Sequence, residues 1–418
     1  MAVDPAAPPP AWAPLPDPPP PDAPPAQGEG APLGWPATLL MVAATILLLA
    51  WPYIDLEVAI PLGRWQADAP VADLAACFFL PIAAVALFRA RLPPGALGYA
   101  VLLGAGLAAA VSSPDRGAAL HELLRKPLFS GLAYGLGLTA FIGTVGRVEP
   151  LRRALLAAVA LCATISLTTS VGRIVAGDTL WFQAIEGLTN NHKTLAVALA
   201  PALPLLWGWS GRAPDRLTRG IVLFGAVALL ASVSRTAWIS VAVAATFFVT
   251  WAGRPLSERK GLLPVVLALG LLGATYGPIL TGSLTQLDAL RSRHSLDKRS
   301  WRLFVESPLV GAGPGASVRV ESATFPDYRV NGVDAHGVIQ KVGAEYGLLG
   351  LVGYGAFVLA NARRLRANHR EGDGRWPTFV ALHTNLLLST EAFTCTHWAI
   401  FAVTVGLALR EETPPELQ

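Results

Sequence analysis

The stretch GALGYAVLLGAGLAAAVSS, residues 95–113, decides the fold class of this chain. It contains no charged side chain, and its length is close to the roughly 20 residues with which an α-helix crosses the hydrocarbon of a bilayer. Comparable apolar stretches recur from Leu33 to Leu409. The pattern therefore predicts a helical protein that crosses a membrane many times.

The composition of the whole chain points the same way. Of the 418 residues, 53% are hydrophobic and 14% are charged, and the mean hydropathy is +0.48. Soluble domains carry about 25% charged residues, so these few charges cannot cover a large soluble core, and a single large soluble enzyme is excluded. The net charge of +4 gives no reason to expect nucleic acid as a partner, because the basic residues lie in short loops between apolar stretches.

The sequence predicts an all-α polytopic membrane protein with about 12 transmembrane helices and one long periplasmic loop that carries short helices. The expected regions are a disordered, Pro-rich cytoplasmic tail (1–34), helices 1 to 9 (35–281), the periplasmic loop (282–336), helices 10 to 12 (337–409) and a cytoplasmic C-terminus (410–418). The expected spans lie near 35–54, 70–89, 95–113, 127–146, 154–172, 194–210, 217–234, 236–252, 261–281, 342–361, 377–391 and 396–409.

The placement of Lys and Arg predicts the orientation. With the tail inside, the inside segments hold more than twice as many Lys and Arg as the short outside loops. This positive-inside bias predicts that both termini are cytoplasmic. The long loop is too short for a nucleotide-binding domain, so we expect chemistry at the outer membrane–water interface. Any activated donor must arrive from the membrane or from outside.

Metal and disulfide chemistry are not indicated. Cys77, Cys162 and Cys395 lie far apart in the sequence and form no CxxC pair. Neither a disulfide framework nor a zinc site is expected from this spacing. No cluster of carboxylates on the outer side demands a metal, and we expect no cofactor.

Charged side chains stand at the start of two predicted spans. Arg235, in ASVSRTAWIS (231–240), lies between two apolar stretches with almost no loop. A charge so near hydrocarbon is costly; it either has a function or snorkels to lipid headgroups. His192 and Lys193, in LTNNHKT (188–194), precede the sixth span on the outer side. They either hold an anionic or sugar group or belong to a helix cap with an interfacial lysine.

The long loop carries a basic stretch, LRSRHSLDKRSWRLFVE (290–306). Arg293, Arg299 and Arg302 stand out, since guanidinium groups bind phosphate oxygens in bidentate fashion. Residues 297–306 predict an amphipathic helix that ends before Pro308. The alternative is a basic surface helix that lies on anionic headgroups.

A histidine and a carboxylate follow where the loop re-enters the membrane, in DAHGVIQKVGAEYGLLG (334–350). His336 is a candidate general base near neutral pH, and a structural histidine is the alternative. Glu345 lies just inside the tenth span, where a carboxylate is a functional candidate.

Together these elements resemble the O-antigen ligase and O-antigen polymerase superfamily of bacterial inner membranes. The resemblance runs from about Thr189 to Phe357. It rests on four motifs in order: NNHKT before a Pro-containing span, the pair Ser234 and Arg235 opening a span, Arg293 fifteen residues before the Pro308 of PLVGAG, and His336 followed by AE-G-LG at Ala344, Glu345, Gly347, Leu349 and Gly350.

The resemblance implies a donor glycan linked to undecaprenyl pyrophosphate and an acceptor hydroxyl on lipid A–core or another glycan, with membrane lipids as surroundings. Arg235 and a loop arginine, Arg293 or Arg299, would hold the pyrophosphate, and His336 would take the acceptor proton in a single inverting displacement without a metal. The remaining expected substrate-binding residues are Arg302, His192, Lys193 and Glu345.

Three functions follow from this reading. A ligase would transfer the glycan to lipid A–core, and a polymerase would instead join lipid-linked repeat units of O-antigen or exopolysaccharide. A polytopic transporter or flippase is the alternative from another class, and it should show related halves or mid-membrane charges.

Overall fold

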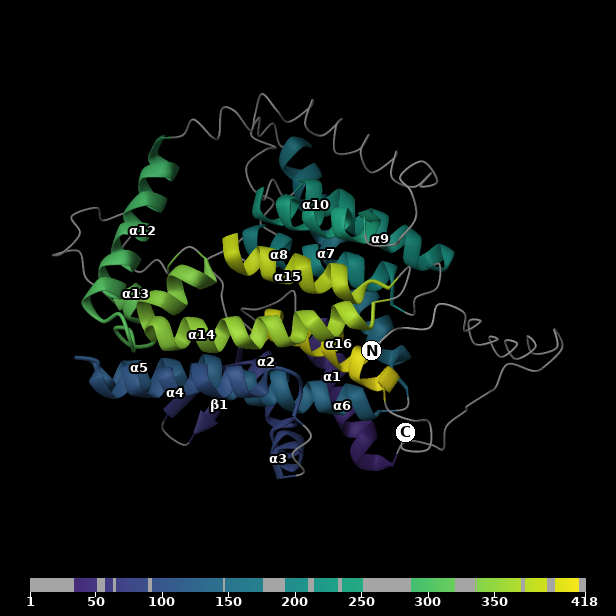
Figure 1. Cartoon of the computed structure of the whole chain (residues 1–418). Helices are drawn as coiled ribbons and strands as arrows, with labels where there is room; N and C mark the ends of the chain where they lie inside the picture. Colours follow the sequence, from purple (N-terminus) through teal and green to yellow (C-terminus); the bar gives the residue numbers. More distant parts are fainter. Residues whose placement is uncertain are drawn as a thin grey trace, which may run out of the picture.

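The computed structural model describes residues 34–50, 57–62, 65–88, 92–145, 147–175, 192–209, 214–231, 235–250, 287–319, 335, 337–369, 373–388 and 395–412. Most of these residues are helical, and long helices run side by side through the body of the molecule (Figure 1).

The helices are α1 (Trp35–Ala50), α2 (Val71–Cys77), α3 (Leu80–Phe88), α4 (Ala96–Ser112), α5 (Arg116–Leu123), the π-helix η1 (Leu124–Leu138), α6 (Thr139–Thr144), α7 (Glu149–Val175), α8 (His192–Trp207), α9 (Arg216–Ala231), α10 (Arg235–Thr250), α12 (Leu287–Glu306), α13 (Ala316–Arg319), α14 (Val338–Ala367), α15 (Arg375–Leu388) and α16 (Cys395–Glu412). One antiparallel hairpin joins β1 (Glu57–Leu62) to β2 (Trp65–Pro70).

Helices coincide with the predicted spans, apart from 261–281, which lies outside the described residues. The second span is divided into α2 and α3, because Pro81 cannot donate to the carbonyl of Cys77 and its ring would clash there. The hairpin β1–β2 is an addition to the all-α prediction. In the long loop, α12 begins at Leu287, ten residues earlier than the expected start at position 297.

Membrane-spanning character is clear in three helical stretches of the described residues. Arg116–Thr144, Glu149–Thr168 and Val338–Ala367 are long and apolar enough to cross a bilayer. Other apolar helices are shorter, for example Ala96–Ser112 and His397–Arg410. The prediction of a helical membrane protein is therefore confirmed, whereas the number of twelve spans stays a prediction.

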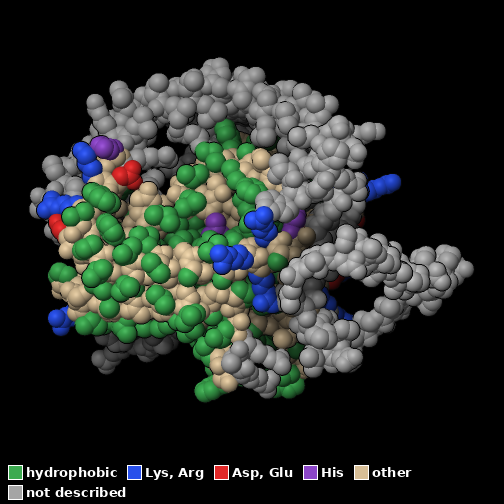
Figure 2. All heavy atoms as spheres, in the orientation of Figure 1, with side chains coloured by type: hydrophobic (Ala, Val, Ile, Leu, Met, Phe, Trp, Pro, Cys, Tyr) green, Lys and Arg blue, Asp and Glu red, His purple; other side chains and the backbone are tan. Residues whose placement is uncertain are grey.

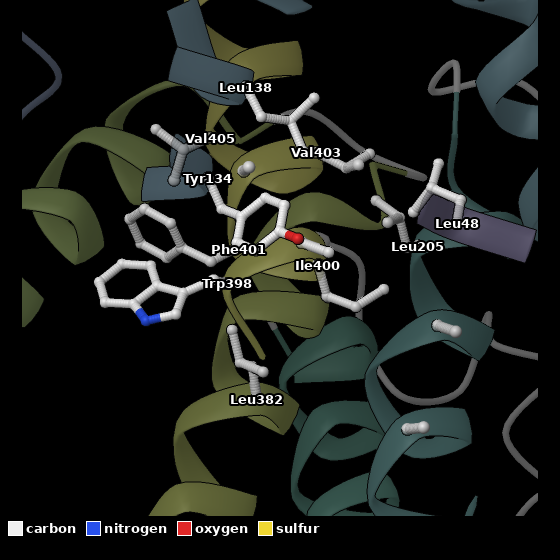
Figure 3. Close-up of a cluster of buried hydrophobic side chains, with 14 of the residues drawn as sticks. Leu48, Tyr134, Leu138, Leu205, Leu382, Trp398, Ile400, Phe401, Val403 and Val405 are labelled. Carbon is white, nitrogen blue, oxygen red and sulfur yellow. The ribbon is translucent and has the colours of Figure 1, made fainter. Parts of the chain in front are cut away.

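The centre of the core is α16. Its residues 397–408 are all buried, so no face of the helix is left for solvent or lipid. Figure 3 shows Trp398 and Phe401 of this helix near Tyr134 of η1, with Leu382 of α15 below them. The aromatic rings of Trp398 and Phe401 meet edge to face at 5.6 Å.

Glycines let α4 and α14 approach closely. A Cβ added at Gly98 would lie 2.7 Å from the carbonyl oxygen of Gly353, and one added at Gly353 would lie equally close to the oxygen of Gly98. Small residues at a helix crossing are typical of membrane bundles, where backbones pack in direct contact. The outer faces of the two helices carry exposed apolar side chains such as Leu97 and Val352, and Figure 2 shows hydrophobic side chains over much of this face.

Polar contacts join helix ends that the positive-inside pattern predicts on the inner side. Arg152 at the start of α7 pairs with Asp215, which precedes α9, at 3.2 Å. Asp215 also accepts the backbone N–H of Thr218 at 2.7 Å, and this hydrogen bond is the main reason why the pKa of Asp215 lies below its usual value. At the start of α15, buried Arg375 donates to the carbonyl of Leu407 in α16.

Candidate active site

The centre of the candidate site is a break in α14. Gly347 has φ 66° and ψ −162°, so the helix is interrupted there. An unbroken helix would pair the N–H groups of Leu348 and Leu349 with the carbonyls of Ala344 and Glu345. The break loses these two bonds and leaves two donors and two acceptors without partners in the helix.

The glycine-rich turn PLVGAGPG (308–315) replaces both lost bonds. The carbonyls of Pro308 and Leu309 accept from Leu348 and Leu349 at 2.8 and 3.1 Å. The N–H groups of Ala312 and Gly313 donate to the carbonyls of residues 344 and 345 at 2.9 and 3.1 Å. The turn is therefore fastened to α14 by four backbone hydrogen bonds, each of which satisfies a group that the break had exposed.

Glycine is required on both sides of this contact. Gly311, Gly313 and Gly315 all have positive φ, at 79°, 106° and 74°. A Cβ at Gly311 would overlap the backbone of residues 345 and 346, and a Cβ at Gly347 would meet the carbonyl of Leu309 at 2.5 Å. Two of the motifs that carry the family resemblance, PLVGAG and AE-G-LG, are thus the two halves of one backbone junction.

Glu345 holds the next element in place. Its side chain is buried, and its carboxylate accepts the Ser317 hydroxyl at 2.5 Å and the Ser317 backbone N–H at 3.4 Å. Ser317 lies in the short helix α13, directly after the glycine turn. The sequence analysis expected Glu345 to bind substrate, and this geometry adds a role in fixing α13 against α14.

The loop arginines occupy different environments. Arg299 is completely buried on α12, which packs against α14. Arg302 is exposed and pairs with Glu306 at 2.8 Å, one turn further on. The side chain of Arg293 lies outside the described residues, but backbone position 293 lies about 120° around the helix axis from position 299. Burial on a helix that packs against α14 distinguishes Arg299 from exposed Arg302 as a candidate for the loop arginine of the site.

The other candidates lie at helix starts. His192 and Lys193 begin α8 and Arg235 begins α10, and these two helices pack against each other and against α15. Their side chains, like the whole of His336, lie outside the described residues. A helix start offers free N–H groups and a partial positive charge, which attract an anion.

The residues beside His336 are described. Ala335 is buried, and Gly337 has φ 93° as α14 begins. A Cβ at Gly337 would meet the carbonyl of Leu387 at 2.5 Å, so the start of α14 lies against the end of α15. The start of α14 therefore adjoins α15, the helix against which α8 and α10 pack.

The sequence analysis missed a polar hollow on the opposite flank of α14. Its volume is about 190 Å³, and its lining consists of Ala118, His121, Glu122, Lys126, Gly315, Val318 and Lys341. In the sequence, Lys126 is one of the few Lys and Arg residues of the short loops that are expected on the outer side. The signal in the sequence was HELLRK (121–126), a polar run too rich in charge for a mere connection between two spans.

The fold and the junction define a helical membrane protein with a polar site at one end of its bundle. Residues 220–355 match the model of the O-antigen ligase family, and this match supports the resemblance to the O-antigen ligase superfamily that the motifs had suggested. The matched region includes α10, α12, α13 and the broken part of α14. A search of curated proteins found no match.

Proposed function

We propose that this protein is a glycosyltransferase of the O-antigen ligase type. It moves a glycan from undecaprenyl pyrophosphate to a hydroxyl of lipid A–core, or of a similar acceptor, at the periplasmic face of the bacterial inner membrane. The observation that carries the proposal is the junction between the glycine turn and α14, which includes buried Glu345 and lies within the region that matches the ligase family. Buried Arg299 lies in the same region, on α12, which packs against α14.

The donor carries its negative charge on the pyrophosphate. Arg235 at the start of α10 and Lys193 at the start of α8 are suited to bind phosphate oxygens, with the helix starts adding N–H donors. Arg299 supplies the second guanidinium from α12. As the bond between the anomeric carbon and the pyrophosphate breaks, these cations stabilise the charge that develops on the leaving oxygen.

The acceptor hydroxyl attacks the same carbon from the opposite face, so the anomeric configuration inverts. His336 takes the hydroxyl proton as the new carbon–oxygen bond forms, and the pyrophosphate departs with the electron pair of the old bond. In this scheme the cationic side chains supply the electrostatic stabilisation, and no step requires a metal.

The cellular test is a clean deletion in the native host, followed by gels of the lipopolysaccharide and extraction of lipid-linked glycans. Long polymer retained on the lipid carrier, with bare lipid A–core, supports the ligase. Lipopolysaccharide capped with a single repeat would instead assign a polymerase. If neither the lipopolysaccharide nor the lipid-linked glycans changed, both the ligase and the polymerase would be contradicted, and a transporter would become the favoured hypothesis.

The mechanistic test uses the purified chain. His336→Ala and Arg235→Ala should each lower the transfer rate about a hundredfold or more, while membrane insertion is unaffected. Normal turnover in either variant would refute the assigned roles.

A further inference from the structure

The hollow between α5, α13 and α14 has the lining of a binding site. Lys341 contributes an ammonium group from a side chain that is only 5% exposed. Lys126 stands at the rim and pairs with Glu122 at 3.0 Å, with side chains 43% and 29% exposed. His121 completes the polar lining. We propose that this hollow binds an anionic sugar of the acceptor, an inference that rests on the proposed function.

The chemistry of the lining fits a sugar that bears a phosphate or carboxylate. Two ammonium groups attract the anion, and the attraction is strong at Lys341 because water is largely excluded there. The carboxylate of Glu122 is an acceptor for sugar hydroxyls, which donate hydrogen bonds. Val318 and Ala118 give an apolar wall for the carbon face of the ring.

The glycine turn provides the space. Gly315 lines the hollow, has φ 74° and carries no side chain, so the wall lies open where the turn passes into α13. Glu345 fixes α13 through Ser317, one residue before Val318 in the lining. The junction at the centre of the candidate site therefore also shapes the hollow.

The position of the hollow assigns it to the acceptor. The helix starts that hold Lys193 and Arg235 belong to α8 and α10, which pack with α15, whereas the hollow is bounded by α5, which packs on α4. The N-terminal half of α14 separates the two, and it begins two residues after His336. α14 therefore has the proposed donor side on one flank and the hollow on the other, as transfer between two substrates requires.

The kinetic test compares four forms of the full-length chain: wild type, Lys126→Gln, Lys341→Gln and the matched control Lys298→Gln, an exposed lysine of α12 outside the hollow. The donor is an oligosaccharide on undecaprenyl pyrophosphate. The acceptors are lipid A–core with phosphorylated core sugars and the same core after enzymatic removal of those phosphates.

Loss of a charge-assisted hydrogen bond should raise KM for the phosphorylated acceptor about tenfold in Lys126→Gln and Lys341→Gln. The donor KM and the control variant should stay at wild-type values, and KM for the dephosphorylated acceptor should be insensitive to both substitutions. A rise in the donor KM alone would assign the hollow to the pyrophosphate and overturn the acceptor assignment. Unchanged KM values in both lysine variants would overturn the site.

A binding measurement separates this site from the proposed reaction. Inorganic phosphate, compared with chloride at equal ionic strength, should raise the Tm of wild type and of Lys298→Gln but not that of Lys341→Gln. Phosphate stabilisation through Lys341 in a chain that transfers no glycan would leave the site standing and refute the proposed function. Normal glycan transfer, with no rise of Tm in phosphate and no change of acceptor KM in the lysine variants, would leave the proposed function standing and refute the site.

Discussion

Replacing Gly347 by alanine tests whether the junction between the glycine turn and α14 organises the site. At φ 66° and ψ −162°, position 347 lies in a region of backbone conformation that is accessible essentially only to glycine. An added Cβ would also meet the carbonyl carbon and oxygen of Leu309 at 2.5 Å and the nitrogen of Gly311 at 2.6 Å. The substitution therefore has to displace the turn or close the break.

The expected cost follows from these contacts. Backbone strain of this kind costs about 1–3 kcal/mol. Displacing the turn also breaks the four hydrogen bonds between residues 308–313 and 344–349, each worth about 1 kcal/mol net. Even if half of these bonds reform, about 3 kcal/mol is lost, which is a change of about a hundredfold in the population of the assembled junction. We expect glycan transfer to fall by a similar factor.

The assay measures initial transfer rate and thermal stability of the purified chain, and Gly355→Ala is the control. Gly355 lies on the same helix, and nothing approaches within 4 Å of a Cβ built there. Alanine at a regular helical position is favoured by up to about 1 kcal/mol, so the control should be as stable and active as wild type. If Gly347→Ala matched Gly355→Ala in both measurements, the junction would not have the role assigned to it.

Three further substitutions test neighbouring parts of the structure. Ser317→Ala removes the hydroxyl that donates to the carboxylate of Glu345 and should lower the free energy of unfolding by about 1.5–3 kcal/mol. The loss should appear as a lower Tm and as faster protease cleavage near α13. An unchanged Tm would show that this hydrogen bond does not contribute to stability. Arg299→Gln should reduce kcat about a hundredfold or more. Arg302→Gln removes only an exposed ion pair, so its free energy of unfolding should stay within about 1 kcal/mol of the wild-type value. Equal losses of kcat in the two variants would remove the distinction between them. Asp215 stabilises the start of α9 in its charged form, and its pKa in the folded protein lies below the unfolded value, so this stability is present above about pH 4 and is lost as the pH falls through the folded pKa. The Tm difference between wild type and Asp215→Ala should therefore disappear in acid. A difference that persists in acid would contradict the role of the Asp215 carboxylate at the start of α9.

The apolar stretches were sufficient to predict helices, because each apolar run of membrane length demands an internally hydrogen-bonded backbone. These apolar stretches were not sufficient to predict the break in α14. Glycine is common in membrane helices, and EYGLLGLVG (345–353) reads as one continuous helix. What opens the helix is the turn at 308–315, more than thirty residues earlier, whose hydrogen bonds no local pattern reveals.

The candidate site, too, could be predicted from the sequence only in part. The motifs named Arg293, with Arg299 as the alternative, and Glu345 as residues of one region. The structure adds that Arg299 and Glu345 are buried on two helices, α12 and α14, that pack against each other. Lys126 and Lys341 lie more than two hundred residues apart and come together only through the packing of α14 on α4 and of α5 beside it. A single sequence does not show which distant residues are in contact, so the hollow could not be predicted from it. Lys126 and Lys341 read only as charges that set topology.

The break at Gly347 also bears on how deeply the residues of α14 would lie in the membrane. Helical residues 348–367 measure about 30 Å at 1.5 Å per residue, which is the full thickness of the hydrocarbon layer. If residues 348–367 make the crossing, the nine residues before the break are not needed for it and would stand above the lipid tails. Lys341 and Glu345, although buried in the protein, would then lie at the level of the headgroups and not among the lipid tails. Under the proposed function, a lipid-linked donor would present its pyrophosphate at the same height, so the position of the break in α14 would bring the protein's charges level with those of the substrate.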